Sequence, residues 1–127
     1  MKQRYVFALG LFLGGLVMTF ATRLWGQDPV RQSPQFYTVR FENDRVRVLE
    51  YHLKPGEKEP MHSHPPGVVF YLSNATFRTT NAEGKSSEAT VTQGQVSWRD
   101  FTTHAAENVG KTEAHAYAVE LKQSPQP

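Results

Sequence analysis

The sequence predicts a single all-β domain, an antiparallel sandwich or barrel, preceded by an N-terminal signal or anchor helix. Two observations favour this fold. No segment after residue 35 keeps a helical period, and short apolar segments recur about every eight to twelve residues between Gly and Pro turns. The 127 residues allow one compact domain and no second core of ordinary size. With 39% hydrophobic and 20% charged residues, the composition is that of a folded chain.

The first element is an apolar N-terminal segment behind positive charges. Two basic residues in 2–4 precede the uncharged run 5–21, YVFALGLFLGGLVMTFA, a pattern typical of a signal peptide. We expect residues 1–26 to export the chain to the periplasm or out of the cell, with cleavage after Ala21 or after Gly26. An uncleaved membrane anchor is the alternative, because a run of this length reaches the lower limit for a membrane-spanning helix.

A linker and a tail flank the domain. Residues 27–34 contain two prolines and no apolar period, so we expect an exposed linker there. Residues 123–127 form a polar tail, which leaves 35–122 for the barrel. From residue 27 onward, eleven Lys or Arg residues stand against twelve Asp or Glu, so the folded part is nearly neutral. It carries no basic stripe, and we therefore expect no nucleic-acid partner and membrane contact only through the N-terminal segment.

The strands of the domain are recognised by alternation and by their bounding turns. In residues 46–53, Leu49, Tyr51 and Leu53 share one face, and Pro55 ends the run. Further strands are expected at 68–72, 76–80, 88–91, 96–98, 103–109 and 115–121. The segment 81–85, Asn-Ala-Glu-Gly-Lys, has the composition of a hairpin loop. The last strand has an apolar face made of His115, Tyr117, Val119 and Leu121.

The candidate chemistry lies in the histidines. The chain has no cysteine, so thiolate sites and disulfides are excluded, and any metal must be held by His, Asp or Glu. His62 and His64 are two residues apart in extended chain, so their side chains leave the same face and can converge on one metal ion. His104 is the natural third ligand from a neighbouring strand. A surface histidine pair without a metal is the alternative interpretation.

Two motifs in this chain resemble the signature of the cupin superfamily over residues 46–121. Gly56 is followed by five residues and His62-Ser63-His64, and Gly94 precedes His104-Ala-Ala-Glu-Asn108. The resemblance implies a small antiparallel jelly-roll barrel with a divalent metal, Fe, Mn, Zn, Ni or Cu, between the motif strands. It also implies that His62, His64 and His104 are the metal ligands and that Asn108 ends the second motif. Small cupins commonly form dimers, so the resemblance suggests a homodimer.

The chain departs from the cupin signature at the carboxylate ligand. In the signature, three or four residues separate the H-x-H pair from a glutamate, and at these spacings this chain has Val68 or Val69. The P-x-G turn of the second motif is replaced by residues 100–102, and His104 arrives one residue early. We therefore expect three imidazoles alone to hold the metal, with open positions for water or substrate.

Other residues are candidates for the surroundings of the metal. Val68 shares a face with Phe70 and Leu72, and we expect it to be an apolar wall inside the barrel. The further candidates for the pocket, or for the layer behind the ligands, are His115, Tyr71, Trp98 and Asn108. His115 is also a candidate fourth ligand, with a hydrogen-bonded core or rim histidine as the alternative. We expect His52, on the opposite parity of its strand, to lie on the surface.

Charged residues near the motifs have two interpretations each. Glu57, Glu59 and Glu107 are within sequence reach of the site and can orient an imidazole, and solvated positions are the alternative. Arg78 and Arg99 can meet an anionic substrate, and solvated strand edges are the alternative.

Two functions fit these observations. One is a metal-dependent enzyme, a dioxygenase or related oxidoreductase acting on a small molecule, because three-histidine sites resemble those of cupin dioxygenases that act on thiols or diketones. The other is an exported, non-catalytic barrel that binds a small ligand or a metal. The motifs of serine hydrolases, P-loop nucleotide hydrolases and Rossmann dehydrogenases are missing from the sequence, so those classes are excluded.

Overall fold

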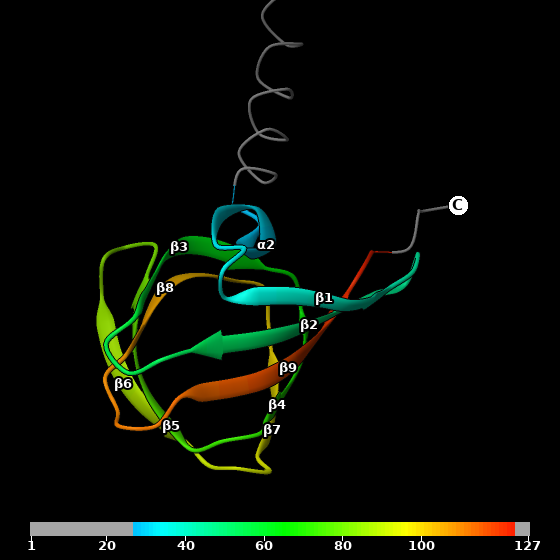
Figure 1. The fold of residues 1–127 in the computed structure, drawn as a ribbon. Coiled ribbons are helices and arrows are strands. Elements are labelled where there is room, and N and C mark those ends of the chain that lie inside the picture. Colours follow the sequence, from blue (N-terminus) through cyan, green and yellow to red (C-terminus); the bar gives the residue numbers. More distant parts are fainter. Residues whose placement is uncertain (1–26, 124–127) are drawn as a thin grey trace, which may run out of the picture.

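The structure is a computed structural model that describes residues 27–123, and these residues form a β-barrel (Figure 1). The strands are β1 Tyr37–Glu42, β2 Val46–Leu53, β3 Lys58–His64, β4 Gly67–Tyr71, β5 Ala75–Asn81, β6 Ser86–Val91, β7 Val96–Arg99, β8 Thr102–Asn108 and β9 Ala114–Leu121. A short helix, α2 Pro29–Gln32, precedes them. The predicted signal or anchor segment, residues 1–26, lies outside the described residues.

Two antiparallel sheets form the opposite walls of the barrel. The five-stranded sheet has the order β1-β2-β9-β4-β7, and the four-stranded sheet has the order β3-β8-β5-β6. Neighbours such as β2 and β9, or β3 and β8, are far apart in sequence, so the chain crosses repeatedly between the walls (Figure 1). The predicted all-β antiparallel jelly roll is confirmed for the described residues. Among them, no helix has the length and apolar character needed to cross a membrane.

The turns between strands follow the predicted chemistry. β5 and β6 form a hairpin around the predicted loop 81–85, in which Gly84 has a φ of 85°. The Asn81 side chain accepts backbone hydrogen bonds from Glu83 and Lys85, at 3.1 and 2.9 Å. A left-handed φ favours glycine, so Gly84 suits the turn that the sequence predicts here.

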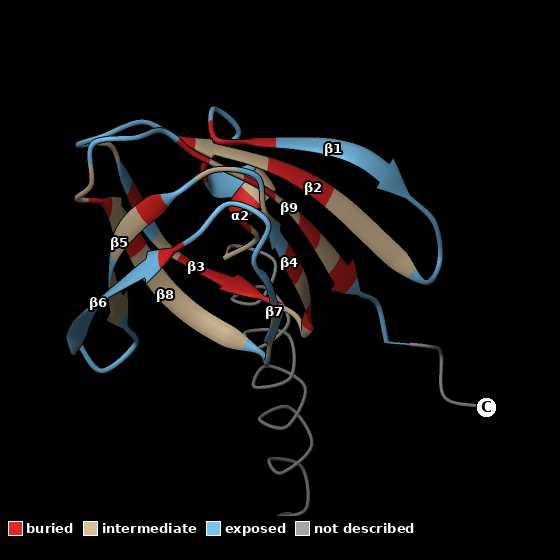
Figure 2. Ribbon diagram, turned by 90° about the horizontal axis from the view of Figure 1, so that it is seen from below, coloured by how far each residue is buried: buried red, intermediate tan, exposed pale blue. Residues whose placement is uncertain are grey.

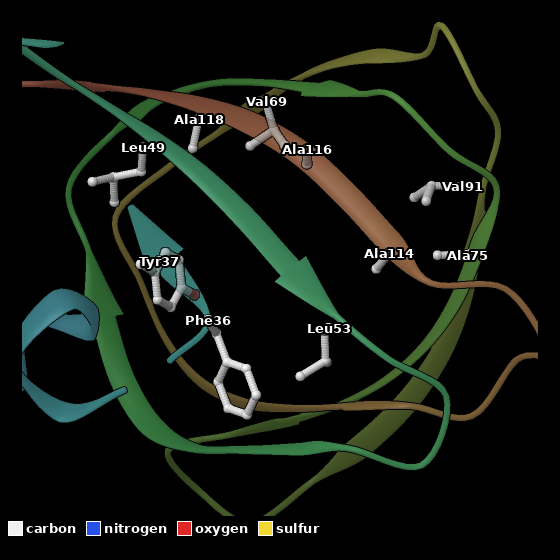
Figure 3. Close-up of a cluster of buried hydrophobic side chains, with 10 residues drawn as sticks. All are labelled: Phe36, Tyr37, Leu49, Leu53, Val69, Ala75, Val91, Ala114, Ala116 and Ala118. Carbon is white, nitrogen blue, oxygen red and sulfur yellow. The ribbon is translucent and has the colours of Figure 1, made fainter. Parts of the chain in front are cut away.

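The buried cluster fills only part of the barrel. Leu49 and Leu53 of β2 are fully buried and pack with Phe36 and Val69 (Figure 3). The inner face of β9 carries three small residues, Ala114, Ala116 and Ala118. Two of these alanines, Ala116 and Ala118, line a cavity of about 110 Å³ that remains inside the barrel.

Two predicted strand faces need correction. The prediction that Val68 lies inside the barrel with Phe70 and Leu72 is wrong, because Val69 is buried and lines the cavity, whereas Phe70 and Leu72 are 41% and 39% exposed. The apolar face of β9 also points outward, and it carries His115, Tyr117, Val119 and Leu121. Burial alternates along both strands (Figure 2), but each has apolar residues on both faces, so the sequence pattern alone does not reveal the inner one.

The predicted linker is part of the folded domain. Within residues 27–34, Pro29 and Ser33 are buried, so the prediction of an exposed linker is wrong there. Asp28 caps the short helix by accepting a hydrogen bond from the Val30 amide at 3.1 Å. Gln27 adds two contacts to β3, since its backbone and side-chain oxygens both accept hydrogen bonds from Ser63 at 2.8 Å. This segment therefore packs against the strand that carries two of the three predicted metal ligands.

Candidate metal centre

The fold brings His62, His64 and His104 together at the inner wall of the four-stranded sheet. His62 and His104 are directly opposite each other in the register of β3 and β8. Each of the three residues offers a ring nitrogen, and these nitrogens lie within 4.8 Å of one another. His62 and His64 are 0% and 2% exposed, so the cluster is sealed from bulk solvent on the β3 side.

A register shift in β3 adds a carboxylate to the same face. Strict alternation would place Glu59 and His62 on opposite faces, but the pairing with β8 shifts between these two residues. Both are buried, and Glu59 Oε1 lies 3.2 Å from His62 Nε2. The irregular β3 therefore points Glu59, His62 and His64 into the barrel, which simple period-two counting does not predict.

Hydrogen bonds at the Nδ1 atoms determine which nitrogens face the cluster. His62 Nδ1 lies 2.7 Å from the Pro60 carbonyl oxygen, and His64 Nδ1 lies 2.8 Å from Glu120 Oε1. A carbonyl oxygen and an ionised carboxylate only accept, so both Nδ1 atoms donate, and each Nε2 carries a lone pair. These two Nε2 atoms are 2.8 Å apart. Two lone pairs at this distance repel unless an electrophile lies beside them.

Burial keeps the three imidazoles neutral. It lowers the pKa of His104 from 6.5 to about 3 and also lowers the pKa of His62 and of His64. The positive charge of Arg99 acts in the same direction on the pKa of each histidine. At pH 7 all three rings are therefore in the form that binds metals.

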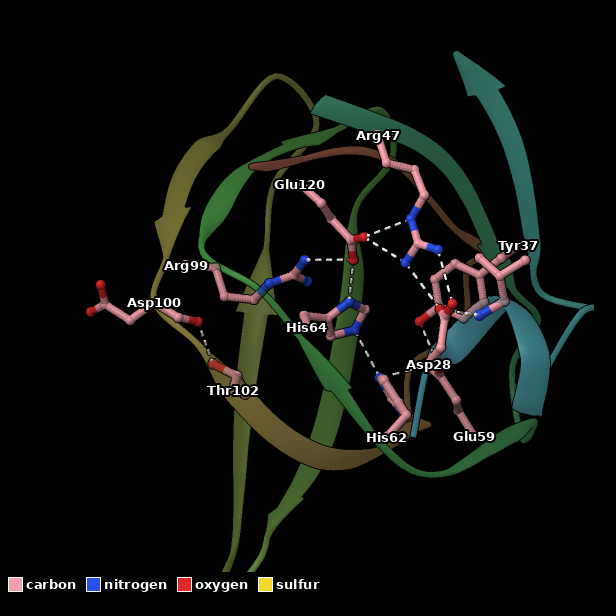
Figure 4. Close-up of polar contacts among 11 residues, drawn as sticks. Asp28, Tyr37, Arg47, Glu59, His62, His64, Arg99, Asp100, Thr102 and Glu120 are labelled. Atoms are coloured by element: carbon pink, nitrogen blue, oxygen red, sulfur yellow. Dashed lines mark hydrogen bonds and ion pairs between the residues drawn. The ribbon is translucent and has the colours of Figure 1, made fainter. Parts of the chain in front are cut away.

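Glu120 links the cluster to the N-terminal segment. It is 1% exposed, and its Oε2 accepts hydrogen bonds from Arg47 Nη2 and Nε at 2.7 and 3.0 Å. Arg47 in turn donates two hydrogen bonds of 3.0 Å to the carboxylate of Asp28 (Figure 4). The chain of contacts Asp28, Arg47, Glu120, His64 fixes the orientation of the His64 ring, as partners behind metal ligands commonly do. Sequence reasoning missed Glu120, because nothing in its strand pattern distinguishes it from a solvated residue.

Glu59 is held by two tyrosines on the opposite wall. The Tyr37 hydroxyl donates to Glu59 Oε1, and the Tyr51 hydroxyl donates to Oε2 at 3.1 Å. Burial raises the pKa of Glu59 from 4.5 to about 7, although both hydroxyls stabilise the ionised form. A carboxyl group that titrates near neutral pH beside His62 can take up and return a proton.

The cavity joins these groups to an apolar wall. It is lined by Tyr37, Tyr51, Glu59, His64, Val69, Tyr71, Phe77, Thr79, Arg99, His104, Ala106, Ala116 and Ala118. Tyr71 is thus on the cavity wall, as the sequence suggested. Arg99 is there too, on the inner face of β7 instead of at a solvated strand edge.

Known proteins resemble this chain in structure, whereas the comparisons by sequence find no match. No family model matches the chain, and no curated protein matches it. A cupin domain from Bordetella pertussis Tohama I is 28% identical, with a TM-score of 0.63 over 68% of this chain and 92% of that one. The chain belongs to the cupin superfamily. An uncharacterized conserved protein with a double-stranded β-helix domain from Klebsiella pneumoniae is 20% identical over 73% and 78% of the two chains, with a TM-score of 0.54. A cupin superfamily protein from Desulfitobacterium hafniense is 12% identical over 68% and 76%, with a TM-score of 0.52.

Two residues predicted to line the pocket of this cupin lie on its outside. Trp98 is 56% exposed and donates from Nε1 to Asp100 at 2.8 Å. It faces Val68 across the β4–β7 register, and neither residue lines the cavity. Placing Trp98 and Val68 in the pocket is therefore wrong. Val69 lines the cavity instead. It stands at the longer of the two spacings at which the cupin signature has its glutamate.

Asn108 closes the end of the barrel and does not line the cavity. Its side-chain nitrogen donates to the carbonyl oxygens of Leu53 and Thr112, each at 2.8 Å. Its side-chain oxygen accepts from the Gly110 amide at 3.0 Å. Asn108 is fully buried, so these three hydrogen bonds satisfy it and hold the β8–β9 turn against β2.

His115 belongs to a second group on the outer face of the five-stranded sheet. It stacks on His52 at a ring distance of 4.1 Å, and its Nε2 lies 2.8 Å from Glu50 Oε1. Glu50 also pairs with His52 and with Arg40. The prediction of His115 as a pocket residue or fourth ligand is wrong, because this group lies across the sheet from the cavity. Nitrogen and oxygen donors of Glu50, His52 and His115 lie within 4.8 Å of one another.

The donor set at the barrel interior fits a divalent metal ion. His62, His64 and His104 supply neutral imidazoles, and the facing lone pairs of His62 and His64 need a cation between or beside them. Val69 offers no carboxylate, so the three grouped ligands are neutral imidazoles, and the Glu59 carboxylate lies beside them at 3.2 Å from His62 Nε2. A metal held by these three imidazoles would have further coordination positions available to water or substrate.

Proposed function

We propose that this cupin is a metal-dependent oxidoreductase, such as a dioxygenase, acting on a small molecule inside the barrel. The observation that carries the proposal is the pair of His62 and His64 Nε2 lone pairs that face each other 2.8 Å apart beside His104. Such an arrangement is unfavourable without a bound cation and suits a divalent ion such as Fe, Mn, Zn, Ni or Cu.

Glu59 is the observation that favours catalysis over binding alone. When bound, a divalent metal would polarise a substrate oxygen or sulfur atom and lower the pKa of that group. Glu59, whose carboxylate lies 3.2 Å from His62 and faces the cavity, is then placed to accept the released proton. Tyr37 and Tyr51 orient its carboxylate, and the apolar wall around Val69 and Phe77 limits the access of water.

Metal content tests the centre directly. Protein purified without chelator and dialysed against trace metals should hold one ion in the barrel, and His62→Ala, His64→Ala or His104→Ala should lower its occupancy at least about tenfold. His52→Ala is the matched control, because His52 lies on the outer face. Equal loss in His52→Ala would assign the metal to the group of Glu50, His52 and His115 and contradict the proposal.

Turnover separates the enzyme from a non-catalytic ligand-binding barrel. Fe(II)-loaded protein is mixed with small thiols, diketones or hydroxy acids, and oxygen consumption is followed with an electrode. We expect the wild type to consume more than one mole of oxygen per mole of enzyme. Glu59→Gln should consume oxygen much more slowly at the same metal content. Tight binding of such a molecule with no turnover in any metal form would instead identify a binding barrel.

We propose in addition that residues 1–26 export the chain to the periplasm or outside, or anchor it to the membrane, and that the barrel forms a homodimer. The charged and apolar pattern of the N-terminus supports export, and exposed apolar residues such as Phe70, Val96 and Trp98 support self-association. Cell fractionation with N-terminal sequencing tests export or anchoring. Analytical sedimentation of residues 27–127 tests the homodimer. Full-length chain in the cytoplasm, or a monomer at all concentrations, would contradict them.

A further inference from the structure

Arg99 brings an unsatisfied guanidinium group into the cavity. β7 alternates so that Arg99 points inward, while Val96 and Trp98 on the same strand are each 56% exposed. Arg99 lines the cavity together with His64 and His104. Its Nε and Nη2 atoms are buried and have no hydrogen-bond partner among residues 27–123. Buried donors of a charged group normally have hydrogen-bond partners, so these two nitrogen atoms without partners need an explanation.

Glu120 does not supply that partner. Its Oε1 forms an ion pair with Arg99 Nη2 at 3.9 Å, which is beyond hydrogen-bond distance. The same oxygen already accepts from His64, and the other oxygen accepts two hydrogen bonds from Arg47 (Figure 4). Glu120 therefore gives Arg99 an opposite charge but no hydrogen bond, and the Nε and Nη2 donors of Arg99 remain available to a molecule in the cavity.

We infer that Arg99 binds the carboxylate of a small organic acid that occupies the cavity. The Nε and Nη2 atoms of a guanidinium form a planar pair of donors that matches the two oxygens of a carboxylate. The same cavity is lined by His64 and His104, so an acid held at Arg99 presents its other donor atoms to the metal ligands. This second half of the inference rests on the proposed metal centre, whereas carboxylate binding by Arg99 does not.

The surroundings favour a singly charged carboxylate over a phosphate. Glu59 and Glu120 flank the cavity and its guanidinium, and they repel a second negative charge on the ligand. The carbon side of the ligand would lie against Val69 and Phe77. The cavity volume of about 110 Å³ admits an acid of only a few non-hydrogen atoms.

Glycolate, a small hydroxy acid, is a suitable probe. Glycolate is titrated into metal-free and Zn(II)-loaded protein, and the ¹⁵N resonance of Arg99 Nε and the heat of binding are recorded. We expect the Arg99 resonance to shift in both forms and the affinity to be higher in the Zn(II) form. Arg99→Met should weaken glycolate binding at least about tenfold without changing the Zn(II) content. Arg99→Lys keeps the charge but not the planar donor pair, so its affinity for glycolate should lie between those of the wild type and Arg99→Met.

Arg78→Met is the matched control, because Arg78 is paired with Glu88 and Glu107 outside the cavity. It should bind glycolate as the wild type does, and ethylene glycol, the neutral analogue, should not shift the Arg99 resonance. Unchanged glycolate affinity in a folded Arg99→Met or Arg99→Lys, or tighter binding of inorganic phosphate than of glycolate, would overturn the inference. Loss of Zn(II) binding with an intact glycolate shift would contradict only the proposed metal centre.

Discussion

Val69 stands where the cupin signature has a carboxylate ligand, and its apolar side chain would leave one more coordination position of a bound metal open. It is 6% exposed and faces the same cavity as His64 and His104. Val68, one residue earlier, lies on the outer face opposite Trp98. A shift of one residue in a strand exchanges the two faces, so only one of these adjacent valines can be replaced by a ligand.

Val69→Glu should restore a fourth protein ligand. We expect Mn(II) affinity to rise about tenfold or more, because a carboxylate is a hard donor that suits this ion. Without metal, the buried carboxylate should lower the free energy of unfolding by about 3 kcal/mol. Thermal melts with and without Mn(II) measure both effects. Val68→Glu is the control from the outer face, and an equal response to Mn(II) in the two variants would show that the assignment of the inner face is wrong.

At the residue scale, the sequence was sufficient to predict the histidine cluster and insufficient to predict its hydrogen-bond partners. Period-two geometry places the side chains of His62 and His64 on one face of a strand. The resemblance to the cupin signature adds His104 to them. Glu120 reaches His64 across 56 positions of sequence, and Arg99 turns inward only because of the register of β7 with β4. Such contacts depend on the closed barrel and have no local signal.

At the scale of elements, the segment 27–34 is coupled to the metal centre. Gln27 accepts two hydrogen bonds from Ser63, which lies between the two histidines of β3. Asp28 forms a bidentate ion pair with Arg47, which in turn holds Glu120. The segment therefore acts on both the strand and the ring orientation of the ligands.

Removal of this segment should weaken the site. A chain that starts at Gln35 should unfold with a free energy lower by about 2–4 kcal/mol than one that starts at Gln27, because Arg47 loses the carboxylate of Asp28. Its Zn(II) affinity should fall about tenfold, since Glu120 and His64 lose their orientation. Urea unfolding and Zn(II) titration measure these quantities. Asp28→Asn in the longer chain isolates the ion pair, and full Zn(II) affinity in the shorter chain would contradict the coupling.

The sequence did not predict this segment because its signal is too short. A helix of four residues has no apolar period, and two prolines favoured an exposed linker. β1 was missed although its sequence, YTVRFE, alternates apolar and polar residues from Tyr37 to Glu42, so a local signal for this strand was present. The long regular strands β2 and β9 were predicted, but not which face of β9 is buried.

For the molecule as a whole, the barrel interior makes stability depend on pH in two opposing ways. Burial lowers the pKa of His104 to about 3, so the unfolded chain binds more protons between about pH 3 and 6.5, and stability falls as the pH falls. At pH 5 this costs about 2 kcal/mol for His104 alone. Glu59 acts oppositely. Its raised pKa means that the folded chain binds more protons between about pH 4.5 and 7, so stability falls as the pH rises through that range.

Glu59→Gln should therefore make metal-free protein more stable at high pH and expose the histidine effect at low pH. At pH 8 the wild type holds an ionised, buried Glu59, and the variant should gain about 3 kcal/mol in free energy of unfolding. This gain should shrink as the pH falls toward 4.5 and vanish about one pH unit below that value, where Glu59 is neutral in both the folded and the unfolded state. Urea unfolding in EDTA across this range measures the difference. Glu83→Gln, in the exposed β5–β6 turn, is the control and should show no such trend. A gain in Glu59→Gln that is the same at every pH would mean that Glu59 has an ordinary pKa and is not the proton acceptor of the site.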